Sequence, residues 1–499
     1  MIAVPTPSSI AALSGNWNSH TTEQAKDLAE RFTHRFGKRP ESLESGPSWV
    51  KFKLDLNEFH LRGLHHLAPC LILGGDEGVA ITVANAFWSD VGARGELPIF
   101  LCSSQVQFQR CRDQIPTGRR LILSPNMVGT LLETGNSRAY LSDLMRQQIS
   151  RLLLSPYNLT QPAEGNMFFG RQHELMRLLD DDGSSYVIAG PSRIGKSSLL
   201  KQYKREIIRR RDPRLSRLHL IDFYDCPGTD ADTVAHHIAF RIEERQRTYE
   251  MTADKLVRFF RGQCKLNGGP LELICDEVDE VCSSDAFQYL AQSAKAGDVR
   301  LILCGRSPNL LNLELGTGSN ACLRLVTLRP QPLDEHAARD LLRRPMADLG
   351  ITIRDETRLL EHVCRMTGRL PHLLQFYGKR LVELATERKL DEVTEELVQV
   401  VESNYETVNF FVSPVHELKD AGTQTIARAL LNDSRQSFTP LEIARVATRL
   451  GQTKSADEIY DICNMLVMQN VLAWTDNNFH VACEGIRHFS RKAGLLKPV

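Results

Sequence analysis

The stretch AGPSRIGKSS at residues 189–198 constrains the fold of this 499-residue chain more than any other feature. It matches the pattern Gly-x-x-x-x-Gly-Lys-Ser through Gly190, Gly195, Lys196 and Ser197. The apolar run SSYVIAG precedes it, and the helical pattern SSLLKQYKREII follows it. Such a loop turns backbone N–H groups toward an anion at a helix start, where the Lys reaches phosphate oxygens and the hydroxyl reaches Mg²⁺. The stretch therefore predicts a phosphate cradle, with an ordinary glycine turn as the alternative.

Four acidic residues at the end of the apolar run LELIC form the second feature: Asp276, Glu277, Asp279 and Glu280. A P-loop enzyme places the carboxylate of its Mg²⁺ shell at the end of an apolar strand, here about 80 residues after the cradle. We expect Asp276 to take this role with Ser197, and Glu277 to polarise an attacking water. Strand-end solvation is the alternative for all four acids, and for Asp279 and Glu280 we favour it.

A third apolar run, VRLILCGRSP, ends in a polar step at Arg306. Ligands of such folds lie at the carboxyl ends of parallel strands, so we expect Arg306 to reach the γ-phosphate or the bound water. A surface arginine without a role is the alternative. The candidate residues of the cradle are Gly190, Pro191, Ser192, Arg193, Ile194, Gly195, Lys196, Ser197 and Ser198.

The runs SSYVIAG, LHLIDFY, LELICDE, VRLILCG and CLRLVTL are nearly all apolar, which is typical of parallel strands covered on both faces. The chain then turns helical, and after about residue 420 three helices precede a hairpin around TDNN, which is a winged-helix pattern. Between about 48 and 135, apolar runs alternate with helical stretches, which favours a small α/β domain. The predicted α/β fold comprises an N-terminal α/β domain (1–150), a linker (151–167), a P-loop NTPase sheet (168–332), a helical lid (333–415) and a winged helix (416–499).

Composition excludes several classes of protein. Lys+Arg and Asp+Glu are equal at 61 each, so no overall field attracts nucleic acid or an anionic membrane. The 12 cysteines are scattered without a CxxC pair, which fits a reducing cytoplasm. No apolar run approaches the roughly 18 residues of a membrane span. The start MIAVPTPSSIAALSG lacks a basic segment before a long apolar core, so we expect no signal peptide.

Several stretches together resemble a known family: FFGRQHELMRLL, the cradle GPSRIGKSSLL, ICDEVDE, ILCGR and LRPQPLDEHAARDLL. They are similar to the STAND-type P-loop ATPases of bacteria and archaea, which are relatives of the AAA+ ATPases and of origin-recognition ATPases. The resemblance implies a nucleotide switch in which ATP and Mg²⁺ reorganise the helical and winged-helix parts, often with oligomerisation, and slow hydrolysis resets the state. It implies that Phe168, Gly170 and Arg171 pack near the adenine. Because members of this family usually act in antiviral defence in bacteria, the resemblance implies that role here.

One departure from the family pattern lies in the predicted lid. The family usually has Thr-Gly-Gly-x-Pro there, whereas this chain has TGRLPHLLQ, with Arg369 in place of the second glycine. Pro371 is retained, so we expect the lid helix to start as usual and Pro371 to belong to the nucleotide site. Arg369 either approaches phosphate or alters the nucleotide contact.

Two other sites are disfavoured. A restriction-type nuclease in the N-terminal domain requires a Glu/Asp-x-Lys step, and no lysine occurs between Lys53 and Lys196. A sensing or docking role is therefore favoured for this domain. Three histidines and a cysteine lie close together in sequence: His60, His65, His66 and Cys70. Without a second ligand pair at zinc spacing, they are a weak indication of a metal.

The third helix of the predicted winged helix argues against insertion into DNA. SADEIYDICNMLVMQN carries Asp457, Glu458 and Asp461 and no basic residue, so phosphate would meet like charge. Basic residues lie elsewhere in this part, at Arg445, Arg449, Lys454, Arg487, Arg491 and Lys492. The basic cluster REIIRRRDPRLSR is read as a solvated helix end.

The favoured function is an ATP-binding, slowly hydrolysing switch that couples nucleotide state to protein assembly or signalling, through a protein partner or self-oligomer. A DNA-acting ATPase of replication-initiator or transposition type is the alternative, since DNA contact through the winged helix stays open. A nucleotide-binding scaffold with little hydrolysis is a third hypothesis.

Overall fold

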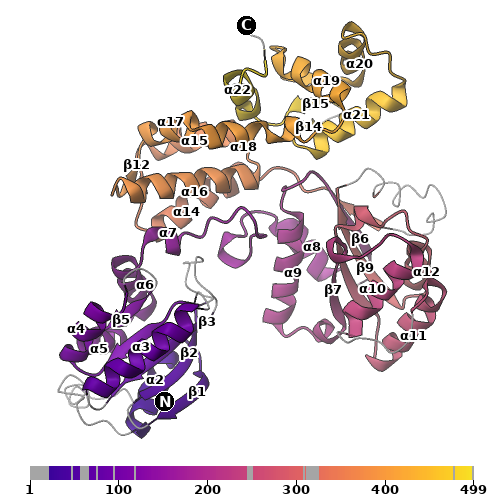
Figure 1. The fold of residues 1–499 in the computed structure, drawn as a ribbon. Coiled ribbons are helices and arrows are strands. Elements are labelled where there is room, and N and C mark those ends of the chain that lie inside the picture. Colours follow the sequence, from indigo (N-terminus) through magenta and orange to yellow (C-terminus); the bar gives the residue numbers. More distant parts are fainter. Residues whose placement is uncertain are drawn as a thin grey trace. The chain divides into compact units, whose positions relative to one another are not determined.

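The structure is a computed structural model of the 499-residue chain, shown as a ribbon in Figure 1. It describes residues 22–46, 49–56, 67–74, 77–93, 96–116, 120–181, 183–243, 251–306, 310, 325–475 and 478–496. Contacts divide the chain into two compact units, each described by itself. The first unit comprises Met1–Tyr157, Arg343–Ile353 and Gly378–Val393; the second comprises Asn158–Leu342, Arg354–Tyr377 and Thr394–Val499.

The first unit contains a five-stranded sheet in the order β1-β2-β3-β4-β5. Its strands are β1 (Glu41–Gly46), β2 (Trp49–Asp55), β3 (Leu67–Leu73), β4 (Ile99–Cys102) and β5 (Leu121–Leu123). Strands β1, β2 and β3 pair antiparallel, whereas β3, β4 and β5 pair parallel. The apolar runs of the sequence analysis form β3, β4 and β5. The pair β1 and β2 was not predicted, although WVKFKLD alternates buried and half-exposed residues as a strand with one covered face does.

Helices of the first unit pack against the strands of this sheet. They are α2 (Thr22–His34), α3 (Glu77–Ala93), α4 (Gln105–Gln114), α5 (Pro125–Glu133) and α6 (Ser137–Gln148), and α7 (Arg151–Leu154) follows them in the chain. Serine side chains cap α4 and α5, because Ser104 and Ser124 accept the N–H groups of Gln107 and Met127. The short strands β11 (Thr352–Ile353) and β12 (Glu392–Val393) pair parallel.

The metal site considered from sequence falls partly outside the described residues, since His60, His65 and His66 lie there. Across the described ranges, no group of three or more His, Cys, Asp or Glu residues is placed to hold a metal ion.

The second unit is built on a parallel sheet in the order β10-β6-β9-β8-β7. Its strands are β6 (Ser185–Ala189), β7 (Leu218–Asp222), β8 (Leu271–Asp276), β9 (Val299–Gly305) and β10 (Leu325–Leu328). Figure 1 shows α8 (Gln172–Asp180) and α9 (Lys196–Arg210) on one face. On the other face lie α10 (Ala231–Glu243), α11 (Leu256–Leu266) and α12 (Ala286–Lys295). The five apolar runs thus form one α/β sheet covered on both sides.

Alternation along β6 divides the core of this sheet between its two faces. Tyr186 and Ile188 pack with the buried leucines of α8 and α9. Val187 and Ala189 pack with the buried residues of α10, α11 and α12. Successive side chains of a strand point to opposite faces, so a strand with helices on both sides is apolar at every position.

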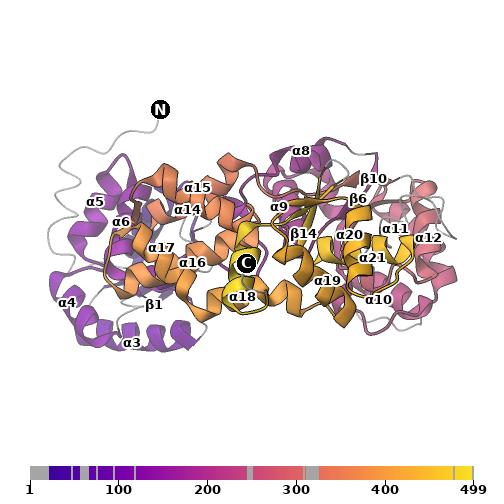
Figure 2. The same cartoon turned by 90° about the horizontal axis from the view of Figure 1, so that it is seen from above.

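The remaining elements are mostly helical. The chain from residue 335 forms α14 (Glu335–Asp348), α15 (Glu356–Thr367), α16 (Pro371–Glu387), α17 (Glu395–Ser403) and α18 (Tyr405–His416). The C-terminal part follows as α19 (Ala421–Asn432), β13 (Ser437–Phe438), α20 (Pro440–Arg449), α21 (Ala456–Met468), β14 (Leu472–Thr475), β15 (Asn478–Val481) and α22 (Glu484–Lys492). Its three strands pair antiparallel in the order β13-β15-β14, and Figure 2 shows α19, α20 and α21 gathered beside β14.

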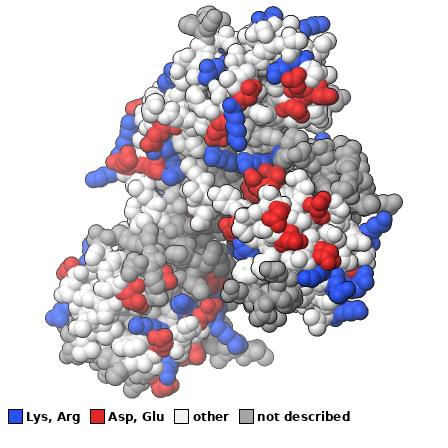
Figure 3. All heavy atoms as spheres, turned by 45° about the vertical axis from the view of Figure 1, so that its right-hand side comes forward, with Lys and Arg blue, Asp and Glu red and all other residues white. Residues whose placement is uncertain are grey.

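Charge on the surface is mixed. The face drawn in Figure 3 carries both basic and acidic side chains, and neither sign covers it. Within the described part of the chain, no helix has the length and apolar character needed to cross a membrane.

A buried ion pair ties the strands together at their amino ends. Glu272 on β8 and Arg300 on β9 are register partners, and Arg300 Nη1 lies 2.7 Å from Glu272 Oε1. Their side chains are only 4% and 6% exposed. Arg300 also donates to the carbonyl oxygens of Ser184 and Leu178, at 2.9 and 3.1 Å. One guanidinium therefore connects β8, β9, the start of β6 and α8.

We expect Arg300→Met to destabilise the protein by about 3–5 kcal/mol, because it leaves the buried Glu272 carboxylate without its cation. The double variant Glu272→Met with Arg300→Met should regain much of this loss, since apolar side chains of similar volume replace both charges. Urea unfolding followed by circular dichroism measures both effects. Equal stability of Arg300→Met and the unchanged protein would contradict the stabilising role of the Glu272–Arg300 pair.

Candidate nucleotide-binding site

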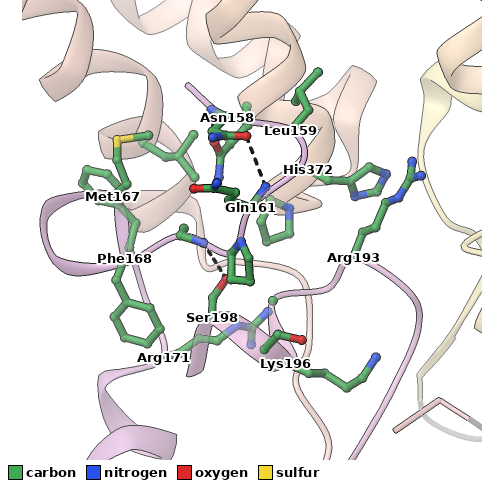
Figure 4. A pocket seen from close by; sticks show the side chains of 18 of the residues that line it. Asn158, Leu159, Gln161, Met167, Phe168, Arg171, Arg193, Lys196, Ser198 and His372 are labelled. Atoms are coloured by element: carbon green, nitrogen blue, oxygen red, sulfur yellow. Dashed lines mark hydrogen bonds between the residues drawn. The ribbon is translucent and has the colours of Figure 1, made fainter. Parts of the chain in front are cut away.

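A pocket of about 600 Å³ lies beside the loop between β6 and α9, within the second unit (Figure 4). Its volume is in the range of small-molecule and cofactor sites. Residues expected from the sequence that line it are Arg171, Ser192, Arg193, Gly195, Lys196, Ser197, Ser198, Glu277, Arg306 and Pro371; Phe168, expected near the adenine, lines it too. Three residues of the loop line a separate cavity instead: Gly190, Pro191 and Ile194. Gly170 and Asp276 line neither of these two cavities.

The loop curves around the ammonium group of Lys196. Lys196 Nζ donates hydrogen bonds to the carbonyl oxygens of Gly190 and Pro191, at 2.9 and 2.8 Å. Gly195, directly before α9, has φ of 102°, which favours a residue without a side chain. Because α9 begins at Lys196, the unpaired N–H groups of its first turn and the positive end of its dipole lie at this loop. Together these groups have the arrangement that can bind an anion.

Arg171 holds the loop from its inner side. It is 9% exposed, and its Nη2 donates to the carbonyl oxygens of Ile194 and Gln331, at 2.6 and 2.7 Å. Glu174 lies 3.4 Å from Nη1. Burial lowers the pKa of Arg171, but an arginine remains charged at neutral pH. The charge therefore serves to fix the backbone of the loop against the segment that follows β10.

Glu277 is the acid that reaches the pocket. It lies at φ 51°, directly after the last residue of β8, and its backbone N–H donates to Asp276 Oδ1 at 3.0 Å. Burial, and then the negative charges of Asp276 and Asp279, raise the pKa of Glu277, while Arg306 and Lys196 act in the opposite direction. A half-buried carboxylate with a raised pKa is suited to accept a proton near neutral pH.

Asp279 is buried and paired, so the expectation of a solvated strand end is wrong for this residue. Its side chain is 8% exposed and lies 3.2 Å from Arg306 Nε, while the Arg306 backbone N–H donates to Oδ1 at 3.0 Å. Glu280 lies 3.8 Å from Arg306 Nη2. The close approach requires Gly305, because a Cβ there would lie 2.5 Å from Asp279 Oδ1. The pairing holds Arg306 at the edge of the pocket.

The residues expected to hold Mg²⁺ fit that ion. Ser197 lines the pocket, and Asp276 ends β8 beside Cys304, whose thiol pKa is raised by burial and by the Asp276 charge. No Lys or Arg in the described ranges forms an ion pair with Asp276, so its negative charge is not neutralised by a basic side chain. A hydroxyl and a carboxylate are the hard oxygen ligands that Mg²⁺ takes beside phosphate oxygens and water.

Part of the pocket wall comes from the stretch treated as a linker. Asn158 Oδ1 accepts hydrogen bonds from Thr160 N at 2.8 Å, Thr160 Oγ1 at 2.9 Å and Gln161 N at 3.1 Å. Asparagine often closes such turns, so the sequence NLTQP carried a signal for this loop. Two backbone N–H groups further on bind α9: Ala163 N donates to Ser198 Oγ and Gly165 N to Gln202 Oε1. Figure 4 shows this wall facing the cradle.

His372 also lines the pocket and was not identified from sequence. Figure 4 shows its ring beside the Arg193 side chain. Burial, assisted by the Arg193 charge, lowers the pKa of His372 to about 3, so the imidazole is neutral at physiological pH. Its position directly after Pro371 in TGRLPHLLQ was the only available signal.

Ser192 of the cradle is hydrogen-bonded to the C-terminal part. Ser192 N donates to the carbonyl oxygen of Met468 at 3.1 Å, and Asn470 Nδ2 donates to the carbonyl oxygen of Ser192 at 2.8 Å. Asn470 lies in the turn between α21 and β14, is 8% exposed and has φ of 56°. Asparagine tolerates this left-handed conformation better than most residues. No sequence pattern indicated this contact.

Arg369 occupies a backbone position that favours glycine. Its φ is 59°, next to Gly368 at 57°, and its carbonyl oxygen accepts the N–H of Leu333 at 3.0 Å. Arg369 is not among the residues that line the pocket. The departure from the family pattern thus places Arg369, with a strained backbone conformation, two residues before the start of α16.

Comparison with known proteins supports a P-loop ATPase domain in the second unit. Residues 179–313 match the family model described as an AAA domain. No curated protein matches the chain.

Several solved structures match part of this chain. The Walker-type ATPase of Pyrococcus abyssi is 14% identical, with a TM-score of 0.49, and the match covers 67% of this chain and 99% of that one. The ORC1 protein of Aeropyrum pernix, solved in complex with DNA, is 16% identical (TM-score 0.39; 69% and 97% covered). A RuvB protein of Thermotoga maritima is 14% identical (TM-score 0.37; 67% and 99% covered).

We expect Arg369→Gly to stabilise the protein by about 1 kcal/mol, because glycine adopts a positive φ without the steric cost that a side chain adds. Differential scanning calorimetry measures the shift in Tm. Nucleotide affinity should change by less than about twofold, since the side chain does not line the pocket. A loss of affinity larger than about tenfold would contradict this assignment and indicate contact with phosphate.

Proposed function

We propose that this chain is an ATP-binding, slowly hydrolysing switch of the STAND type, in which the C-terminal part is a winged helix that senses the cradle. The observation that carries the proposal is the pair of hydrogen bonds between Ser192 and the turn at Met468 and Asn470. These bonds engage both backbone groups of a cradle residue. A phosphate that draws the cradle amides inward therefore acts directly on the attachment of the C-terminal part. The N-terminal unit is proposed to sense or dock a partner.

In the proposed reaction, Lys196 and the amides of the loop bind the phosphates, and Ser197 and Asp276 hold Mg²⁺, which neutralises phosphate charge when bound. Lys196 exchanges its contacts with the Gly190 and Pro191 carbonyls for phosphate oxygens. Glu277 accepts a hydrogen bond from the attacking water and then its proton. Arg306, held by Asp279, supplies positive charge at the edge of the pocket.

Coupling between nucleotide and C-terminal part follows from the same contacts. If phosphate binding weakens the bonds of Ser192, release of the C-terminal part must strengthen phosphate binding by an equal factor, because linkage between two sites is reciprocal. The freed surface of α21 and β14 then becomes available for protein partners or for a second copy of the chain. Slow hydrolysis sets the lifetime of this state.

Glu277→Gln should abolish most ATP turnover and leave ATP affinity nearly unchanged, because the amide cannot accept the proton from water. In the unchanged protein, turnover should fall as the pH drops through the raised pKa of Glu277, at a higher pH than an ordinary glutamate would give. Phosphate release in steady state measures both effects.

Lys196→Ala provides the control, since it should lower ATP affinity itself. Equal ATP affinity in Lys196→Ala and in the unchanged protein would contradict the cradle assignment. Duplex DNA is added in a parallel series: the switch predicts no change in turnover, whereas stimulation by DNA together with a mobility shift would favour the DNA-acting alternative.

In the absence of nucleotide, Asn470→Gly should weaken the attachment of the C-terminal part to the cradle. The change removes one hydrogen-bond donor to Ser192, while glycine keeps the left-handed backbone. Loss of one hydrogen bond of about 0.5–1.5 kcal/mol should change ATP affinity by about twofold to tenfold. Hydrogen exchange over residues 456–481 and ATP titration are the measurements.

Lys389→Gly is the matched control, since Lys389 also has a positive φ of 56° and does not line the pocket. It should leave exchange at residues 456–481 unaltered. If Asn470→Gly behaved like this control, Ser192 would not transmit the nucleotide state to the C-terminal part.

A further inference from the structure

One end of the nucleotide pocket carries amide side chains in place of the charges of the cradle. Gln375 and Asn158 both line the pocket, and Gln375 Oε1 accepts the backbone N–H of Asn158 at 3.1 Å. Figure 4 shows Asn158 and Leu159 at the side of the pocket away from Lys196. Leu159, Leu333 and Leu341 add apolar surface to the lining. Lys196 and Ser197 define the phosphate end, and the amide end lies at the other side of the pocket, where the base of a nucleotide can be placed.

The orientation of the Gln375 amide is fixed by its neighbour. A backbone N–H can only donate, so the atom of Gln375 that faces Asn158 N must be the oxygen. The nitrogen Nε2 therefore points away from that contact, and in the described part of the chain no acceptor is found for it. Gln375 is 7% exposed and lines the pocket, so its unused N–H groups are held at the wall of a site that can supply an acceptor.

The Asn158 amide is restricted in the same way. Its Oδ1 already accepts three donors, from Thr160 N, Thr160 Oγ1 and Gln161 N. An amide oxygen offers two lone pairs, so no capacity to accept remains at this atom. At Asn158 only the amide N–H groups can therefore bind a base, whereas Gln375 offers its two N–H groups and one remaining lone pair on Oε1.

We propose that Gln375 is a base-binding residue that donates a hydrogen bond from Nε2 to a ring nitrogen of the base. The inference rests on the proposed function, because it assigns the contact for the base of the same nucleotide. Adenine carries acceptors at N1, N3 and N7 and a donor at its 6-amino group. The N–H groups of Gln375 Nε2 can pair with a ring nitrogen and cannot pair with the amino group. Gln375 lies one helical turn after Pro371 on α16, so both residues lie on one face of this helix and line the pocket.

The experiment measures dissociation constants for ATP and for 1-deaza, 3-deaza and 7-deaza ATP, in which one ring nitrogen at a time is replaced by C–H. In the unchanged protein, one of the three analogues should bind about threefold to tenfold more weakly than ATP, because it lacks the acceptor for Gln375. In Gln375→Glu this penalty should vanish, since a carboxylate has no N–H while one of its oxygens still accepts the Asn158 N–H.

Gln399→Glu is the matched control, since Gln399 is exposed on α17 and does not line this pocket; it should keep the full penalty. Gln375→Met serves as a second variant in case the carboxylate disturbs the fold, and it should also remove the penalty. Equal binding of ATP and all three analogues by the unchanged protein would overturn the proposal, as would an undiminished penalty in both Gln375 variants. Failure of the proposed function is distinct, because ATP itself would then not bind and Lys196→Ala would change nothing.

Discussion

The hydrogen bonds of Arg171 are the interaction on which the rest of the site depends. One guanidinium nitrogen binds the carbonyl oxygens of Ile194 and Gln331, so a buried charge joins the cradle to the segment between β10 and α14. A loop that must direct its N–H groups at an anion has to direct carbonyl oxygens elsewhere, and a buried cation satisfies them. Removing it would leave two carbonyl groups unpaired behind the phosphate site.

Several residues of the site that are not glycine have a backbone conformation in the left-handed region, with positive φ. Arg171, Arg193, Glu277, Arg369 and Asn470 all have φ between 56° and 62°, except Glu277 at 51°. Each such residue costs about 1–2 kcal/mol relative to a relaxed backbone. Such costs persist only where surrounding contacts fix the conformation, and they gather at functional sites. Here the left-handed conformations direct the Glu277 side chain into the pocket and the Asn470 amide toward the cradle.

The sequence predicts what depends on local pattern and fails where contacts are distant. The Gly-x-x-x-x-Gly-Lys-Ser spacing and five apolar runs locate the cradle and the strands of its sheet, because both follow from neighbouring residues. The strand WVKFKLD was not predicted, because its buried and half-exposed residues alternate and form no continuous apolar run. The contact between Asn470 and Ser192 spans 278 positions, and nothing in either local sequence requires it. The pairing of Asp279 with Arg306 was misjudged because acids at a strand end look alike until the partner is placed.

Ser192 of the cradle forms hydrogen bonds with both the C-terminal part and Arg306. Its N–H binds Met468, its carbonyl oxygen binds Asn470, and its hydroxyl oxygen accepts a hydrogen bond from Arg306 Nη1 at 3.4 Å. Arg306 in turn is paired with Asp279, and its charge opposes the rise in the pKa of Glu277 that burial causes. The C-terminal part and the proposed catalytic acid are therefore connected through Ser192 and Arg306. The base end of the pocket is built from different residues, on the linker and the lid. In the proposed switch, the C-terminal part therefore responds to phosphate, while residues of the linker and α16 bind the base.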